Sequence, residues 1–311
     1  MIDTGKINND VFKDYLHFVA ERHKIWEARQ RGEPGPWTDD PVLQGRKFTN
    51  VFRALDWGSQ FLINELFRYV YPNDVSMRDI VVRAFLYRYT NRPDPWEFYY
   101  EYHGRYPRTV DLDAVEETWE LFRTHGGGVF GNAYTMFSGA ENKGMSRVEW
   151  LLGLARQYFT PDSPNDVIPA LVKTSSVAER LAILQTVPRC ADFMSMQVAT
   201  DIGYSSALPS DENEIILAGP GAKRGIAAFA PGEDPVAVIH YVRDALPGWL
   251  GDDTPRIILP DGRERFPSLL DVQNTFCELS KYLRYKYKPG AGRRYSPAHG
   301  QIPPPVLPDH W

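Results

Sequence analysis

The stretch from Val187 to Gly225 constrains the fold more than any other part of the chain. It places a short turn, which contains Pro188, between two apolar runs with helical spacing. Twenty-three positions lead from Pro188 to Asp211, which is room for a hairpin, a helix of about three to four turns and a short connector. Asp211, Glu212 and Glu214 then form an acidic cluster. We expect two helices joined by a tight hairpin and followed by a carboxylate-bearing loop; a helix pair with an ordinary solvated acidic loop would produce the same pattern.

Helical spacing of apolar residues extends over most of the chain. Residues 10–31 form an amphipathic pattern, and residues 46–71, ended by Pro72, form the strongest helical block. Further helices are expected over residues 77–89, 95–102, 112–124, 146–158, 166–174, 176–186, 191–202, 235–245 and 268–285, with another that begins near Gly221. Only residues 250–266 suit a small β-hairpin, and we find neither a βαβ alternation nor an internal repeat. The predicted fold class is therefore mainly α.

The organisation into domains follows from length and from segments that break helices. A chain of 311 residues can hold two helical lobes around a shared cleft. The segment HGGGVFGNAYTMFSG (125–139) is too rich in glycine for a long helix, so we expect a loop there. We therefore predict a helical body over residues 1–285, with two lobes divided near 126–145. Residues 286–311 should form an extended, weakly packed C-terminal tail.

Composition excludes several classes of protein and of site. Hydrophobic residues make up 43% of the chain, which is enough for a sizeable core. The net charge of −5 argues against a uniformly basic surface for nucleic-acid binding, but it allows a local basic stripe. The two cysteines and seven histidines show no metal-ligand spacing, and no nucleotide-binding P-loop or GxSxG motif occurs. We predict no metal, cofactor or membrane span, and a cytoplasmic location (the host cytoplasm for a viral protein).

The N-terminal part gathers polar and aromatic residues that could form a pocket. Asn50, Arg53 and Asp56 recur at spacings of three, so we expect them on one helix face, near Trp37 and Gln60. Arginine offers a bidentate fork to an anion, asparagine presents a donor and an acceptor, and an aromatic ring can stack on a planar group. The pattern therefore suits a pocket for a planar ring or an anion, although an ordinary solvated helix face would show the same spacing.

Two further segments carry candidate site residues. The turn Gly219–Gly221 opens a helix and is followed by Lys223 and Arg224, which predicts an anion site unless it is a simple turn with surface charges. On the last helix, Glu278 and Lys281 are spaced for a salt bridge. Cys277 beside them could be a nucleophile if nearby cations lowered its pKa, but a packed thiol is the simpler reading.

Five blocks together resemble a known family. In chain order they read WTDDPVLQGRKFTNVFRALD, FGNAYTMFSG, PRCADFMSMQVATDIGYS, DENEIILAGPGAKRGI and DVQNTFCELSKYLR. They are similar to the helical DNA base hypermodification proteins of bacterial viruses, which comprise the helical domain of 5-hydroxymethyluracil DNA kinases and the α-glutamyl/putrescinyl thymine pyrophosphorylases. The likeness covers roughly residues 15–285. It implies a relation to helix-hairpin-helix DNA glycosylases, with two helical lobes, although the hairpin PRCAD lacks the usual glycines.

The resemblance implies chemistry on DNA. An activated thymine, 5-pyrophosphoryloxymethyluracil, would lose pyrophosphate to the amine of an amino acid or polyamine after the base is flipped out of the stack. The implied partners are DNA carrying modified thymine, the amine co-substrate and a 5-hydroxymethyluracil DNA kinase. Two alternatives stay open, a DNA glycosylase that uses Asp211 and a non-catalytic DNA-binding module that serves the kinase.

The resemblance also implies roles for particular residues. Asp211 or Glu212 would act on the attacking amine. The candidates for base or co-substrate binding are Trp37, Asn50, Arg53, Asp56, Gln60, Tyr134, Glu278 and Lys281. The candidates for phosphate or DNA binding are Arg189, Gly219, Gly221, Lys223 and Arg224.

Overall fold

The computed structural model describes residues 2–68, 76–131, 144–214, 216–288 and 301–311. The described chain is mainly helical, as expected, and divides into two compact units. Unit 1 comprises residues 1–56 and 215–305, and unit 2 comprises residues 57–214 and 306–311. Among the described helices, none combines the length and the apolar character that a membrane span requires.

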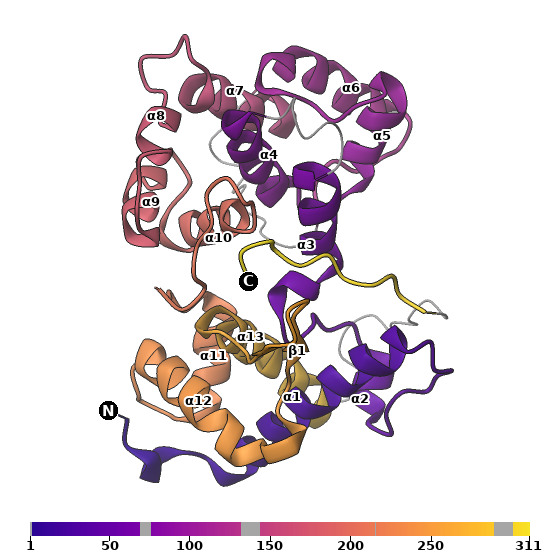
Figure 1. Cartoon of the computed structure of the whole chain (residues 1–311), viewed down its shortest axis with the longest axis vertical. Helices are drawn as coiled ribbons and strands as arrows, with labels where there is room; N and C mark the ends of the chain where they lie inside the picture. Colours follow the sequence, from indigo (N-terminus) through magenta and orange to yellow (C-terminus); the bar gives the residue numbers. More distant parts are fainter. Residues whose placement is uncertain (1, 69–75, 132–143, 215, 289–300) are drawn as a thin grey trace. The chain divides into compact units, whose positions relative to one another are not determined.

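Unit 1 is built around the last helix of the chain (Figure 1). Its elements are η1 (Thr4–Lys6), α1 (Asn9–Gln30), α2 (Pro41–Gly45), η2 (Arg53–Leu55), α11 (Pro220–Phe229), α12 (Pro235–Leu250), η5 (Gly251–Asp253), β1 (Ile257–Ile258), β2 (Glu264–Arg265) and α13 (Leu269–Tyr287). The two strands pair antiparallel, with Ile257 opposite Arg265, as predicted for residues 250–266. Rings of Tyr15, Phe229 and Phe276 pack together in the core and join α1, α11 and α13.

Close packing of α11 on α13 depends on two glycines. A Cβ atom added at Gly221 would lie 2.2 Å from Cys277 Sγ, and one added at Gly225 would lie 2.0 Å from the carbonyl oxygen of Phe276. Real Cβ atoms do not approach other atoms this closely, so only glycine allows the two backbones to come together here. The Gly219–Gly221 segment therefore has a packing role in addition to opening α11.

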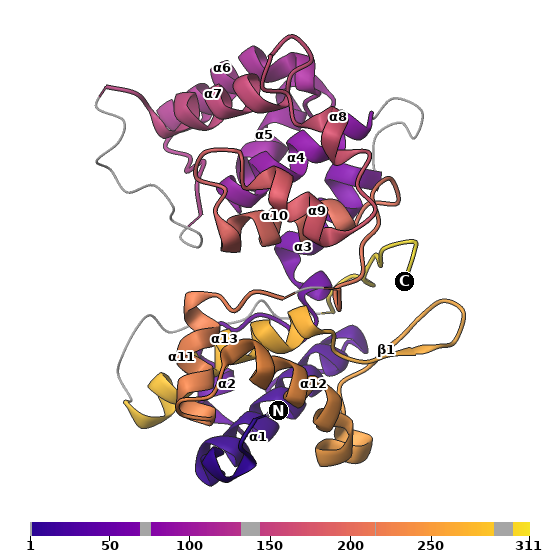
Figure 2. The same cartoon turned by 90° about the vertical axis from the view of Figure 1, so that its left-hand side faces the viewer.

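Unit 2 contains the remaining helices (Figure 2). They are α3 (Trp57–Phe61), the π-helix η3 (Leu62–Arg68), α4 (Met77–Thr90), α5 (Asp94–His103), η4 (Thr109–Asp111), α6 (Leu112–Thr124), α7 (Arg147–Phe159), α8 (Ile168–Leu171), α9 (Val177–Leu184) and α10 (Asp192–Gly203). Helix α4 is buried along nearly its whole length, in contact with α7 and α10. Its buried Arg88 forms a bidentate ion pair with Asp201 of α10, with both N–O distances 2.7 Å. This pair joins two helices that are more than 100 positions apart in the sequence.

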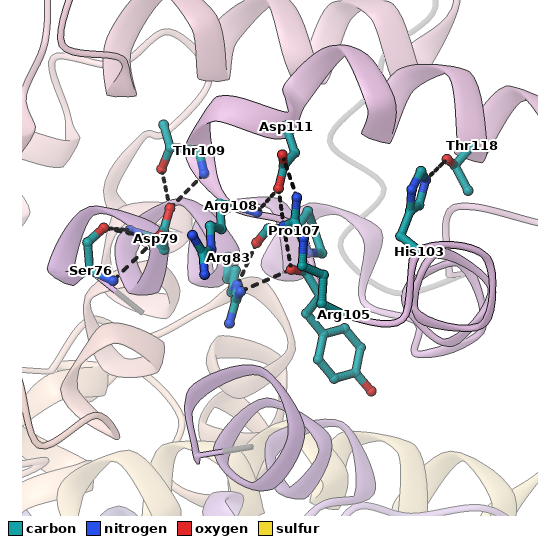
Figure 3. Close-up of polar contacts among 11 residues, drawn as sticks. Ser76, Asp79, Arg83, His103, Arg105, Pro107, Arg108, Thr109, Asp111 and Thr118 are labelled. Carbon is teal, nitrogen blue, oxygen red and sulfur yellow. Dashed lines mark hydrogen bonds and ion pairs between the residues drawn. The ribbon is translucent and has the colours of Figure 1, made fainter. Parts of the chain in front are cut away.

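Buried polar groups also attach the connector between α5 and α6 to α4 (Figure 3). The Arg83 guanidinium donates hydrogen bonds to the carbonyl oxygens of Tyr106 and Pro107, and burial lowers the pKa of Arg83 to about 10. Asp79 accepts hydrogen bonds from the backbone N–H and the hydroxyl of Thr109 at 2.6 and 2.8 Å. These contacts satisfy backbone groups of the connector that form no regular secondary structure.

One expected helix was wrong over much of its length. Residues 46–71 do not form a single helix: η2, α3 and η3 occupy parts of this range, and residues 47–52 are not helical. The physical reason is local, because Asn50 donates its side-chain amide to the Leu55 carbonyl and its backbone N–H to Asp56. Polar side chains thus take the backbone partners that a continuous helix would need.

The tail and the loop at 125–139 differ in how far they are described. Residues 301–303, expected to be weakly packed, hydrogen-bond to the end of α1: Gln301 donates to Gln30, Gln30 to Pro303, and the Ile302 N–H to Arg29. Residues 132–143 lie outside the described residues, so the lobe division near 126–145 stays a prediction. The glycosylase-like arrangement of lobes also stays a prediction.

Candidate functional site

A short turn without glycine joins α9 to α10 at the position where a hairpin was predicted, and the helix-hairpin-helix character of this segment stays a prediction. Arg189 takes the left-handed backbone conformation there, with φ of 68°, which costs a non-glycine residue about 1–2 kcal/mol. The hydroxyl of Tyr89 donates a 3.0 Å hydrogen bond to the Arg189 carbonyl and stabilises the turn. Cys190 beside it is buried, and burial raises the pKa of its thiol to about 12. The hairpin therefore exposes Arg189 while its neighbouring thiol stays protonated.

The acidic loop that follows α10 presents two adjacent carboxylates in different environments. Asp211 is exposed, and its Oδ1 accepts hydrogen bonds from the backbone and side-chain amides of Asn213. Glu212 is 8% exposed and accepts a 2.9 Å hydrogen bond from the hydroxyl of Tyr204. The ring of Trp311 lies edge-on against Tyr204, with centroids 6.2 Å apart. One acid of the loop therefore faces solvent, and its neighbour in the sequence is buried.

The acidic loop is held in place from α9. The Arg180 guanidinium donates hydrogen bonds to the carbonyl oxygens of Leu208 and Pro209 at 2.8 and 3.1 Å. The carboxylate of Glu214 accepts the N–H of Val177 at the start of α9, at 2.6 Å, where the helix dipole favours a negative charge. These contacts position Asp211 and Glu212 on a fixed support.

Three other predicted site residues have separate surroundings. Gln60 forms two hydrogen bonds with the backbone of Val306, one from each end of its amide group. The Trp37 indole N–H donates to the Glu33 carbonyl, and the Arg29 guanidinium lies 5.1 Å from the Trp37 ring. Tyr134 lies outside the described residues.

In unit 1, loop residues 47–56 pack against α13 through a polar network. Asn50, Arg53 and Asp56 do not share a helix face, which corrects that expectation, because Asn50 lies in a loop and Arg53 in η2. The backbone N–H of Arg53 donates to Asp271 at 2.8 Å, and that of Thr49 donates to Glu278 at 3.1 Å. The network thus brings residues of the predicted N-terminal pocket to Glu278 of the last helix.

Arg22 and Asn274 complete this network. Arg22 donates hydrogen bonds to the Thr49 carbonyl at 2.9 Å and to Asn50 Oδ1 at 2.6 Å. Asn274 donates to the hydroxyl of Thr49 and to the carbonyl of Asn50. Sequence analysis missed both residues, as it missed Tyr204 and Arg180 in the other unit. The available signals were two capping patterns: Ser268-x-x-Asp271 marks where α13 begins, and Ser176-x-x-Glu179 marks where α9, which carries Arg180, begins.

Asp56 should make the stability of the protein depend on pH. Loss of solvation raises the pKa of its carboxyl to about 7, and the charge of Glu278 adds to this rise. The hydrogen bond from the Asn50 N–H and the charges of Arg22 and Arg53 lower the pKa but do not offset the rise. Between about pH 4 and pH 7 the folded protein therefore binds more protons at Asp56 than the unfolded chain does. We expect the contribution of Asp56 to the free energy of unfolding to fall as pH rises through this window.

The matched variant for this prediction is Asp56→Asn. Its stability, measured by urea denaturation at pH 5 and pH 8, should decline less with rising pH than that of the parent protein. An equal decline in both proteins would contradict the role of Asp56.

The start of α11 lies directly against α13. The Gly219 N–H donates to Gln273 Oε1 at 3.1 Å, and Lys223 and Arg224 are exposed. Glu278 and Lys281 form an ion pair at 2.6 Å. Burial, aided by the charge of Glu278, raises the pKa of the Cys277 thiol, although Lys281 and Arg224 act in the opposite direction. A raised pKa is the reverse of what a nucleophilic thiol requires, so Cys277 is a packing residue.

The predicted residues therefore fall into two groups. Unit 1 holds the residues of the polar network and of the start of α11: Asn50, Arg53, Asp56, Glu278, Lys281, Gly219, Gly221, Lys223 and Arg224. Unit 2 holds Arg189, Asp211, Glu212 and Gln60.

Comparison with known proteins assigns the family. The family model described as "5-hmdU DNA kinase, helical domain" matches residues 9–291. The chain belongs to this family. It is also similar to a protein named "5-hmdU DNA kinase" from Bacillus phage SP10, with 24% identity over 305 residues, which cover 93% of this chain and 47% of the relative. This family member thus spans about half the length of the curated relative it matches. No solved structure matches the chain significantly.

Proposed function

We propose that this protein hypermodifies thymine-derived bases in DNA. In the proposed reaction, the amine of an amino acid or polyamine displaces pyrophosphate from 5-pyrophosphoryloxymethyluracil. Two findings support the proposal. The chain belongs to the family of the 5-hmdU DNA kinase helical domain, and its acidic loop carries one exposed and one buried carboxylate at consecutive positions. The second finding carries the catalytic part, because a binding module has no need for such a pair.

The proposed reaction is a substitution at the exocyclic methylene carbon. A carbon–nitrogen bond forms as the carbon–oxygen bond to pyrophosphate breaks, and the leaving group departs with the electron pair of that bond. The nitrogen loses a proton, for which Asp211 or Glu212 is the proposed acceptor. General base catalysis of this kind contributes about 10²–10⁴-fold to a rate. The exposed Asp211 can reach a bound ammonium, and Glu212, fixed by Tyr204, supplies the desolvated negative charge.

The remaining assignments concern binding. In the proposal, Lys223, Arg224 and the Gly219–Gly221 turn bind phosphate, because both cations are exposed in the first turns of α11, where the helix dipole favours an anion. Arg189 contacts the DNA backbone from the hairpin. The polar network of unit 1, with Asn50, Arg53, Asp56, Glu278 and Lys281, binds the base or the co-substrate. Trp37, Gln60 and Tyr134 stay candidate contacts on the strength of the resemblance.

The experiment that tests this function is nucleoside mass spectrometry after transfer in vitro. DNA containing 5-pyrophosphoryloxymethyluracil is incubated with the protein and a mixture of amino acids and polyamines. We expect a 5-aminomethyl-type adduct and free pyrophosphate. Asp211→Asn or Glu212→Gln should lower the rate by about 10²–10⁴-fold. Asp162→Asn is the control, because it removes an exposed carboxylate elsewhere in unit 2 and leaves the acidic loop intact. Full transfer by both acid variants would refute the scheme.

A second candidate has its own support. The relative from Bacillus phage SP10 is named as a kinase, and this chain matches 47% of its length. This favours the alternative that the chain is a DNA-binding module that serves a 5-hydroxymethyluracil DNA kinase. In that case no amine would give an adduct, and DNA affinity would be the same in Asp211→Asn as in the parent. A free base and an abasic strand would instead indicate a glycosylase.

A further inference from the structure

Three neighbouring segments of unit 1 carry a group of cations, although the chain has a net charge of −5. We call it the α13 basic surface, and it comprises Arg46, Lys47, Lys223, Arg224, Lys281, Arg284 and Lys288. These residues come from three separate segments: the loop after α2, the first turns of α11 and the C-terminal half of α13. Only the tertiary structure brings them together.

Aromatic rings order the C-terminal end of this surface. The guanidinium groups of Arg46 and Arg284 lie 4.6 and 4.9 Å from the ring centroid of Tyr285. Lys281 lies 4.7 Å from the ring of Phe48, and the rings of Phe48 and Tyr285 are in edge contact at 6.3 Å. Cation–π contacts of this kind hold the cations at the surface without neutralising them.

Helix α11 continues the surface toward the other end of α13. Gly221 lies against Cys277, and both Arg224 and Lys281 act electrostatically on the Cys277 thiol. From Cys277 to Lys288 the chain advances eleven residues, or about 16 Å in helical geometry. With one phosphate per 3.4 Å along a strand, this length corresponds to about five nucleotides.

Few carboxylates neutralise the surface. Glu278 pairs with Lys281 at 2.6 Å, and we leave Lys286 out of the surface because it pairs with Asp14. Within the described residues, no ion pair engages the other lysines, Lys47, Lys223 and Lys288, and none is found for Arg224 or Arg284. Elsewhere in unit 1, exposed cations are typically paired, as Arg263 is with Asp261 and Lys24 with Asp253. Like charges without an ion-pair partner repel one another, and an anionic partner would relieve the repulsion among these five cations.

We propose that the α13 basic surface binds the phosphate backbone of DNA. The proposal rests on the proposed function in that DNA is taken as the substrate, and it adds Arg46, Lys47, Arg284 and Lys288 to the contacts expected at α11. Tyr285, which both guanidinium groups contact, offers its edge or its hydroxyl to the same strand. The surface supplies sequence-independent affinity, because phosphate contacts position a protein on DNA without reading its bases.

The test measures the affinity for a fluorescent, unmodified DNA duplex at several salt concentrations. The test variant is Lys47→Gln/Arg284→Gln/Lys288→Gln. The control variant, Lys24→Gln/Arg243→Gln/Arg263→Gln, removes the same charge from cations of unit 1 that are ion-paired. We expect the test variant to bind at least about ten-fold more weakly and to lose about 2–3 from the slope of log affinity against log salt, whereas the control keeps the slope.

A charge-retaining variant separates loss of charge from loss of folding. This variant, Lys47→Arg/Arg284→Lys/Lys288→Arg, should keep the parent slope. An unchanged slope in the test variant, or an equal loss in the control, would overturn the proposal. Unmodified DNA carries no pyrophosphate, so the binding result does not depend on transfer. Binding through this surface, together with no adduct in the separate transfer assay on activated DNA, would refute the proposed function and leave the binding proposal standing.

Discussion

Replacing Asp201 with asparagine should lower the free energy of unfolding by about 3–5 kcal/mol, the loss typical of breaking one side of a buried ion pair. Arg88 and Asp201 are joined by two hydrogen bonds of 2.7 Å, and their side chains are 5% and 0% exposed. The variant would remove the Asp201 carboxylate from a buried guanidinium, that of Arg88. Denaturant unfolding followed by circular dichroism measures the loss.

The control for this prediction is an exposed ion pair of the same unit. Arg156 contacts Asp113 and Glu116 with its side chain 36% exposed. Arg156→Gln should cost no more than about 1 kcal/mol, because solvent screens the exposed charges. A loss in Asp201→Asn as small as that in Arg156→Gln would show that the buried pair contributes little to the fold.

Replacing Gly225 with alanine should destabilise unit 1 by about 1–3 kcal/mol or more, the usual cost of an overpacked contact. The new Cβ would lie 2.0 Å from the carbonyl oxygen of Phe276 and 2.9 Å from its carbonyl carbon. Backbone atoms cannot rotate away as a side chain can, so α11 would have to move off α13. Thermal unfolding of the variant gives the change in stability.

Gly153 offers the matched control on α7. It is exposed in the middle of its helix, and an added Cβ would meet no atom within 4 Å. Alanine at this position should raise the free energy of unfolding by about 0.5–1 kcal/mol, because glycine has the lower helix propensity. If Gly225→Ala also stabilised the protein, the close approach of α11 and α13 would be refuted.

Local patterns predicted much of the secondary structure. Helix α6 covers residues 112–124 as expected, and α1 and α4 begin and end within one or two residues of the predicted bounds. The periodicity of apolar residues and the caps are properties of neighbouring positions, so they can be read without the fold. The block at 46–71 failed because its polar side chains bind backbone groups: Asn50 and Asp56 close a loop that their spacing alone does not reveal.

The candidate site shows the same division. The sequence indicated two separate sets of site residues: Glu278 with Lys281, and Asn50 with Arg53 and Asp56. The fold joins the two sets, because Thr49 contacts Glu278 and Arg22 binds both Thr49 and Asn50. It also pointed to Asp211 and Glu212 as equivalent acids. Their different exposure depends on Tyr204, which the sequence did not single out.

The sequence by itself determined that the chain is mainly helical, where most helices lie, and which family its ordered blocks resemble. These properties depend on residues a few positions apart, or on their order along the chain. Only the tertiary structure decided which carboxylate is desolvated, that Gly225 must lack a side chain, and that cations from three segments form one surface. Solvation and electrostatic interaction depend on distance in space, and residues such as Arg46 and Arg284 become neighbours only when the chain folds.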